Sequence, residues 1–140
     1  MIIVIDTNVL VSGLLKEYST SATVLRLILE DKIKLAYDIR IIDEYRDVLK
    51  RDKFGFKNEQ VEAIIEQIKA EGISVVAGPI ASLLPDEDDS PFLEVALAGG
   101  VKFLITGNKK HFPQKICKEV KILSPSEFVI LYNKLRDRNE

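Results

Sequence analysis

The sequence predicts an α/β protein with a central parallel sheet of about five strands between two layers of helices. Short runs of aliphatic residues alternate with longer segments whose apolar residues recur at helical spacing, and this alternation is typical of βαβ units. The first run, Ile2–Ile5, is apolar at every position, as expected for a central strand covered on both faces. With 140 residues, the chain is expected to form one domain, residues 1–140. Right-handed crossovers leave few ways to arrange such a sandwich.

The elements of the N-terminal half can be predicted in order. After strand Ile2–Ile5, the next element that we expect is a helix near Ser21–Leu29, which follows a polar loop. Strand Ile33–Tyr37 leads into a helix over Ile39–Leu49. In the next helix the apolar residues lie at i, i+3, i+4 and i+7 and form one stripe, with Asn58 as the expected N-cap; the stripe consists of Val61, Ile64, Ile65 and Ile68.

The C-terminal half continues the alternation with strands at Ile73–Ala77, Phe103–Ile105 and Val120–Leu123. Between the first two of these strands, Phe92–Leu97 predicts a well-buried helix that ends at the stop signal Gly99-Gly100. The residues Ser124-Pro125-Ser126-Glu127 form a capping box with proline at the first helical position, which predicts a final helix.

The bulk composition narrows the class of protein. A formal net charge of −2 argues against a protein that coats nucleic acid, but not against an enzyme that meets phosphates through a bound cation. Cys117 is the only cysteine, which excludes an intrachain disulfide and a cysteine-based zinc site. The apolar run before Asp6 is too short for a signal peptide or a membrane span. We therefore expect a cytoplasmic protein without a membrane partner.

Several acidic residues are expected to meet at one edge of the sheet. Open parallel sheets bind ligands beyond the carboxyl ends of their strands, where the strand order reverses. Asp6 directly follows the first strand, Glu44 lies one to two turns into the helix after the second, and Asp89 starts a helix whose N-terminus lies at the same edge. Asn108, just beyond the fourth strand, is expected there too. Carboxylates gathered at close range need protons or a cation, and such oxygen ligands suit Mg²⁺ or Mn²⁺.

Each residue also has an interpretation without catalysis. Asp6 is a reasonable N-cap, and Glu44 could pair with Arg40 or Lys50 on the surface. The run Asp86–Asp89 could be a solvated helix start, where acids favour the positive end of the dipole, and Thr106 and Asn108 could shape a turn. Their convergence on one edge favours a functional site. For RNA contact, the basic candidates on the rim are Arg46, Lys109, Lys110 and His111.

Four segments in order resemble the motifs of PIN domains. They are Asp6–Val9, Asp43–Phe54 with its acid at Glu44, Asp86–Ala98 with its acid at Asp89, and Phe103–Asn108. The resemblance runs from residue 2 to about residue 129. It implies a three-layer α/β/α fold and an endoribonuclease that uses Mg²⁺ or Mn²⁺ to hydrolyse single-stranded RNA. Asp6, Glu44 and Asp89 would be the catalytic and metal-binding residues, supported by Thr7, Asn8, Thr106 and Asn108.

The resemblance is strongest to the toxins of prokaryotic toxin–antitoxin pairs, which implies an antitoxin partner and a homodimer. Apolar residues at Ile39–Ile42, which could exceed the needs of one core, also suggest a dimer. One position departs from the family: Asn108 stands where aspartate is common, so a second cation is less expected.

Two other classes of protein share some of these sequence features. A phosphoacceptor receiver domain would need an acidic neighbour for Asp6, an aspartate after the third strand and a lysine after the fifth, and the sequence has none of these. The other alternative is a PIN-like scaffold that has lost activity through Asn108 and binds RNA or a partner protein without cutting. Metal-dependent RNA cleavage that disappears in Asp6→Asn would distinguish the enzyme from the scaffold.

Overall fold

The computed structural model describes residues 1–80 and 84–138. Its strands are β1 (Ile2–Ile5), β2 (Lys34–Tyr37), β3 (Ile73–Ser74), β4 (Phe103–Ile105) and β5 (Lys121–Leu123). Its helices are α1 (Thr7–Leu15), α2 (Thr20–Leu29), α3 (Ile39–Leu49), α4 (Asn58–Glu71), α5 (Ser90–Ala98), α6 (Gln114–Cys117) and α7 (Pro125–Arg138).

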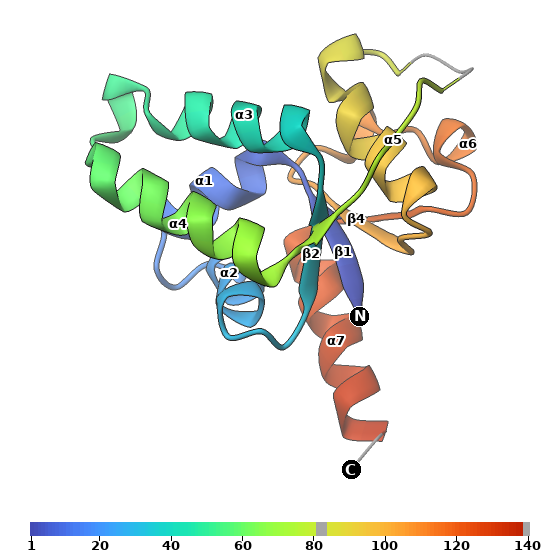
Figure 1. The fold of residues 1–140 in the computed structure, drawn as a ribbon. Helices are drawn as coiled ribbons and strands as arrows, with labels where there is room; N and C mark the ends of the chain where they lie inside the picture. Colours follow the sequence, from blue (N-terminus) through green and yellow to red (C-terminus); the bar gives the residue numbers. More distant parts are fainter. Residues whose placement is uncertain (81–83, 139–140) are drawn as a thin grey trace.

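The strands form one five-stranded sheet in the order β3-β2-β1-β4-β5, and every neighbouring pair is parallel. The chain moves from β1 to β2 and β3 on one side and then places β4 and β5 on the other side. The strand order therefore reverses between β1 and β4, which is where ligands bind in open parallel sheets. In Figure 1, α1, α2 and α4 lie to one side of the strands and α5 and α6 to the other. The predicted three-layer α/β/α class is confirmed.

The core is built around β1. Ile3, Val4 and Ile5 are completely buried, and burial of each such side chain contributes about 1.5–3 kcal/mol to folding. Helix α5 packs against β1, β2 and β4, while α2 packs against α1 and α7. Residues Ile2–Ile5 are therefore all apolar because β1 is covered on both faces, as the sequence predicts.

Side-chain caps fix where several helices begin. Ser19 Oγ accepts from Ala22 N at 3.1 Å to open α2, and Asp38 Oδ1 accepts from Ile41 N at 3.0 Å to open α3. The predicted capping box of α7 is present in both directions: Glu127 N donates to Ser124 Oγ at 3.1 Å, and Ser124 N donates to Glu127 Oε1 at 2.9 Å. Helix α5 stops at Gly99, and Gly100 follows with a positive φ of 62°.

The structure differs from the sequence prediction in four places. Helices α1 and α6 were not among the expected elements. Strand β3 is Ile73–Ser74 and does not extend to Ala77, because it is an edge strand and Val76 is 97% exposed. Asn58 is the first helical residue of α4, and Lys57 occupies the N-cap position.

The apolar cluster at Ile39–Ile42 is mostly used by the chain's own core. Ile41 and Ile42 are each 1% exposed, and Ile39 alone is open to solvent at 67%. The cluster is therefore no argument for a dimer. Within residues 1–80 and 84–138, no helix combines the length and the apolar character needed to cross a bilayer.

Candidate active site

The carboxyl edge of the sheet opens into a cleft of about 530 Å³ beside the point where the strand order reverses. Asp6, Glu44 and Asp89 all line this cleft, and so do Asp86 and Asp88. Asp6 comes from the end of β1, Glu44 from α3, and the others from the segment that opens α5. The structure therefore brings together the three acids that the sequence selects, from three separate parts of the chain.

Asp6 is held from both its backbone and its side chain. Its N–H donates to Ile105 O in β4 at 2.9 Å, and its Oδ2 accepts from the Thr106 hydroxyl at 2.9 Å. The residue is only 6% exposed. Burial raises the pKa of the Asp6 carboxyl above its usual value, and the hydrogen bond from Thr106 partly offsets this rise. A cation near Asp6 would therefore relieve a real cost of ionisation.

Glu44 faces the same cleft from α3. Its Oε2 accepts a hydrogen bond from the hydroxyl of Thr7, the first residue of α1. Burial raises the pKa of Glu44, the bond from Thr7 lowers it, and the charge of Asp6 raises it further. The alternative surface pairs do not form: Arg40 binds Asp38 and Glu94 instead, and Lys50 lies 3.5 Å from Glu62.

Asp89 carries the largest perturbation of the three. It occupies the N-cap position of α5, and its pKa is raised from 3.8 to about 6 by burial and then by the charge of Asp6. Its Oδ2 lies 3.1 Å from Nδ1 of His111. Apart from this contact, the buried oxygen accepts no hydrogen bond from the described residues. A buried carboxylate oxygen that accepts no hydrogen bond is unusual, and a bound cation would satisfy it.

The donor atoms of the cleft suit a hard divalent cation. All three principal acids offer carboxylate oxygens, and Asp89 Oδ2 is free of other hydrogen bonds within the described residues. In that part of the chain, no three acidic, histidine or cysteine side chains stand close enough, as positioned, to enclose an ion. Mg²⁺ commonly keeps several waters and binds through only one or two carboxylates together with substrate phosphates. The cleft fits that kind of site and not a closed protein cage.

The predicted supporting residues surround Asp6. Thr106 is completely buried, and its hydroxyl both donates to Asp6 and accepts from Asn108 N at 3.1 Å. Asn8 lines the cleft, and its Oδ1 accepts from Gly107 N at 3.3 Å. Asn108 is exposed, and the cleft lining does not include it. Its backbone N–H therefore helps to orient the Thr106 hydroxyl.

The four predicted basic residues divide into one that lines the cleft and three that do not. His111 lines it beside Asp89. Arg46 Nε donates to both carboxylate oxygens of Glu62 in α4 at 2.9 Å, and Lys109 Nζ lies 2.9 Å from Glu127 in α7. Lys110 is exposed outside the cleft lining.

Other cationic residues line the cleft without having been selected from the sequence. Lys16, Arg51 and Lys53 stand on its wall together with Phe54. Asn8 and Ser12 are four residues apart, so they share one face of α1. Lys16, the C-cap residue, follows at the same spacing, and this spacing identifies it once the segment is read as a helix. Arg51 and Lys53 belong to the basic stretch after α3 that is visible in the sequence.

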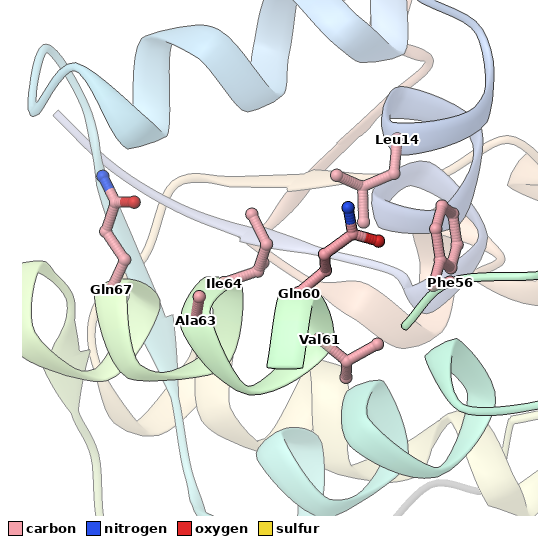
Figure 2. Close-up of a pocket in the computed structure, with 7 residues that line it drawn as sticks. All are labelled: Leu14, Phe56, Gln60, Val61, Ala63, Ile64 and Gln67. Atoms are coloured by element: carbon pink, nitrogen blue, oxygen red, sulfur yellow. The ribbon is translucent and has the colours of Figure 1, made fainter. Parts of the chain in front are cut away.

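A separate hollow of about 440 Å³ lies between α1 and α4. Figure 2 shows the Leu14 side chain from α1 and the Phe56 ring beside the Gln60 side chain of α4, and Val61 and Ile64 of α4 also line the hollow. Its lining contains no charged residue, so it lacks the carboxylates and cations that the cleft at the sheet edge provides. The chemistry of the molecule therefore concentrates in the acidic cleft.

The fold and the cleft together define an α/β domain with a carboxylate-lined site at the switch point of a parallel sheet. The PIN domain family matches residues 2–110, and the chain belongs to this family. PIN domains are generally nucleases. Among curated proteins, none matches the chain significantly.

A solved structure shares the fold at low identity. It is the crystal structure of VapBC2 from Rickettsia felis bound to a DNA fragment from their promoter. The two chains superpose with a TM-score of 0.59 at 16% identity, over 89% of this chain and 98% of the other. At this identity the similarity supports the shared fold alone.

Proposed function

We propose that this chain is a divalent-metal-dependent endoribonuclease that hydrolyses phosphodiester bonds in single-stranded RNA, with Mg²⁺ or Mn²⁺ as cofactor. The observation that carries the proposal is the convergence of Asp6, Glu44 and Asp89 on one open cleft, where Asp89 Oδ2 is buried without a hydrogen bond among the described residues. Membership of the PIN domain family supports a nuclease.

Each acidic residue would have a distinct part in holding the site. Asp6 and Asp89 would be the principal metal-binding groups, and Thr106 keeps the Asp6 carboxyl in one orientation. Glu44, oriented by Thr7, would hold a water or the cation itself. When bound, a divalent cation would act as a Lewis acid that neutralises charge on the scissile phosphate and makes a coordinated water more acidic.

The basic wall of the cleft would bind the RNA backbone. Lys16, Arg51 and Lys53 stand on the same cleft as the acids, so they can hold phosphates next to the one being cut. Lys53 Nζ lies 5.1 Å from the centre of the Phe54 ring, which gives a charged and partly aromatic surface of the kind that single strands favour. This arrangement explains how a chain with net charge −2 can act on a polyanion.

The decisive experiment compares cleavage by matched carboxylate variants. Asp6→Asn and Glu44→Gln should each lower Mn²⁺-dependent cleavage of a labelled single-stranded RNA by about a hundredfold or more, because they remove charge where the cation binds. The control is Asp43→Asn, which removes the neighbouring carboxylate on α3 that faces Arg46 and is 64% exposed. Cleavage that persists with EDTA, or that falls equally in the control, would contradict the proposal.

We further propose that the protein works as the toxin of a toxin–antitoxin pair, acts in the cytoplasm and forms a homodimer. These proposals rest on the resemblance of its four motifs to such toxins. Induced expression should arrest bacterial growth, and Asp6→Asn should abolish the arrest. The alternative, an RNA-binding or partner-binding scaffold without activity, would give RNA binding without cleavage. Sedimentation at high micromolar concentration tests the dimer, and a monomer there would exclude it.

A further inference from the structure

Tyr45 contacts the elements that carry all three acids of the cleft. It follows Glu44 in α3 and is completely buried. Its hydroxyl donates to Ile5 O at 2.6 Å, and Ile5 directly precedes Asp6. Its ring centre lies 6.3 Å from that of Phe92 in α5, three residues after Asp89. One side chain thus connects the end of β1, the middle of α3 and the first turn of α5.

The hydroxyl of Tyr45 acts on the peptide group that positions Asp6. The carbonyl of Ile5 and the N–H of Asp6 belong to the same planar peptide unit. Its N–H donates to Ile105 O at 2.9 Å in β4, and its carbonyl accepts from Tyr45. The pairing of β1 with β2 involves Ile2 with Lys34 and Ile3 with Leu35, so Ile5 lies beyond those pairs. The tyrosine therefore holds one polar end of this peptide while β4 holds the other.

Packing alone does not account for a tyrosine at this place. A phenylalanine would fill the same volume and keep the contact with Phe92, whereas a buried hydroxyl is unfavourable unless it is hydrogen-bonded. The bond to Ile5 O satisfies that requirement at the residue before a proposed metal ligand. The ring, by contrast, is used for ordinary core packing among α3, β1 and α5.

We propose that Tyr45 is a positioning residue, whose hydroxyl fixes the Ile5–Asp6 peptide and so sets the place of Asp6 relative to Glu44 and Asp89. This inference rests on the proposed metal site. Groups behind metal ligands typically change metal affinity by 10–100-fold when they are removed. Because Tyr45 acts through the backbone, we expect an effect at the lower end of that range.

The chain provides a matched control for this hydroxyl. Tyr37 is also mostly buried, and its hydroxyl also donates to a backbone carbonyl, that of Lys69 at 2.9 Å in α4. Tyr45→Phe and Tyr37→Phe therefore remove the same group from the same kind of bond, at the site and away from it. Each should lower the melting temperature in EDTA by about 3–5 °C, so both proteins remain folded at 15 °C.

Two measurements at 15 °C test the proposal. Titration of the metal-free proteins with Mn²⁺, followed by the electron paramagnetic resonance signal of the free ion, should show affinity weakened about tenfold in Tyr45→Phe and changed less than twofold in Tyr37→Phe. Hydrogen exchange of the Asp6 amide, measured by NMR without metal, should be faster in Tyr45→Phe than in Tyr37→Phe.

The outcomes separate this inference from the proposed function. If the wild-type protein binds no Mn²⁺, the proposed metal site is wrong. In that case the exchange of the Asp6 amide still tests Tyr45, and equal exchange rates in the two variants overturn its positioning role. If the wild type binds Mn²⁺ and both variants bind it equally, the hydroxyl has only a general effect on stability and the inference fails. Selective weakening in Tyr45→Phe together with faster exchange establishes it.

Discussion

Thr106→Val is the substitution whose effect can be worked out most fully from the structure. Valine has nearly the same shape as threonine, so it leaves no cavity in this completely buried position. It removes the hydroxyl that donates to Asp6 Oδ2 at 2.9 Å and accepts from Asn108 N at 3.1 Å. The change therefore removes the hydrogen bond that the Thr106 hydroxyl donates to Asp6 and leaves the packing around residue 106 unchanged.

The expected loss follows from the two bonds. A hydrogen bond to a charged group contributes about 1.5–3 kcal/mol, and a neutral one about 1 kcal/mol. Because valine also gains from burial and Asn108 N can meet water, we expect a net loss of about 2–3 kcal/mol at pH 8, or about 6–12 °C in melting temperature.

The loss should depend on pH with a defined sign. Burial raises the pKa of Asp6 in the folded protein, and Thr106 lowers it. The variant therefore binds a proton at higher pH than the wild type does. The difference in unfolding free energy is largest when Asp6 is ionised in both proteins, and it shrinks as the pH falls and the carboxyl is protonated.

Urea unfolding of the metal-free proteins at pH 5 and pH 8 measures this difference. Thr23→Val is the control, since Thr23 is a half-buried residue of α2 that does not line the cleft. Its hydroxyl lies 3.4 Å from Ser19 O and accepts a hydrogen bond from Arg26 at 3.2 Å. Its effect should be below about 1 kcal/mol at both pH values. A Thr106→Val loss that equals the control, or that is the same at both pH values, would refute the reasoning.

Three further predictions concern the charge of the cleft and the fit of α1. Asp89→Asn should stabilise the metal-free protein at pH 8 by about 1 kcal/mol after allowance for solvent screening, and not at pH 4. The reason is that a folded-state pKa of about 6, above the usual 3.8, makes ionisation unfavourable as the pH rises through 6; melts in EDTA that show no pH dependence would contradict this. Asn108→Asp should tighten Mn²⁺ binding, but less than about tenfold because the side chain is exposed, and an unchanged affinity would place it outside the site. Gly13→Ala should cost more than about 1 kcal/mol of stability, since its Cβ would lie 2.9 Å from the Ser21 carbonyl oxygen, whereas Gly78→Ala has nothing within 4 Å and should be nearly neutral by the same melts.

The sequence predicts the sheet well because each strand is a short apolar run with a clear boundary. It misses α1 because that helix is short and mostly apolar: Val9, Leu10, Val11 and Gly13 are all buried, and Asn8 and Ser12 alone are too few polar positions to reveal a helical period. It extends β3 too far because Val75–Ala77 have strand-like side chains, whereas a lone edge strand stops where its hydrogen-bond partner ends.

The residues of the site that could be predicted are those whose place follows from the order of strands and helices. Asp6 and Asp89 follow from topology, because a residue after a parallel strand or at the start of a helix that returns to such a strand lies at the carboxyl edge of the sheet. Glu44 lies one to two turns into α3, a helix that starts at the same edge. Lys16 depends on α1 and could not be placed without it. Arg51 lines the cleft and Arg46 does not. This difference depends on which face of α3 meets α4, and only the packed structure shows that Arg46 binds Glu62.

The hydrogen bond between Thr106 and Asp6 joins residues 100 positions apart. This separation determines when the site can form during synthesis of the chain. At about 5–20 residues per second of synthesis, Asp6 leaves the ribosome's catalytic centre some 5–20 s before Thr106 is made. Until β4 is in place, the peptide before Asp6 has no Ile105 to bind and its carboxyl has no hydroxyl to orient it. We therefore expect the nascent chain to be inert toward RNA, including the message being translated, until most of the domain has been made.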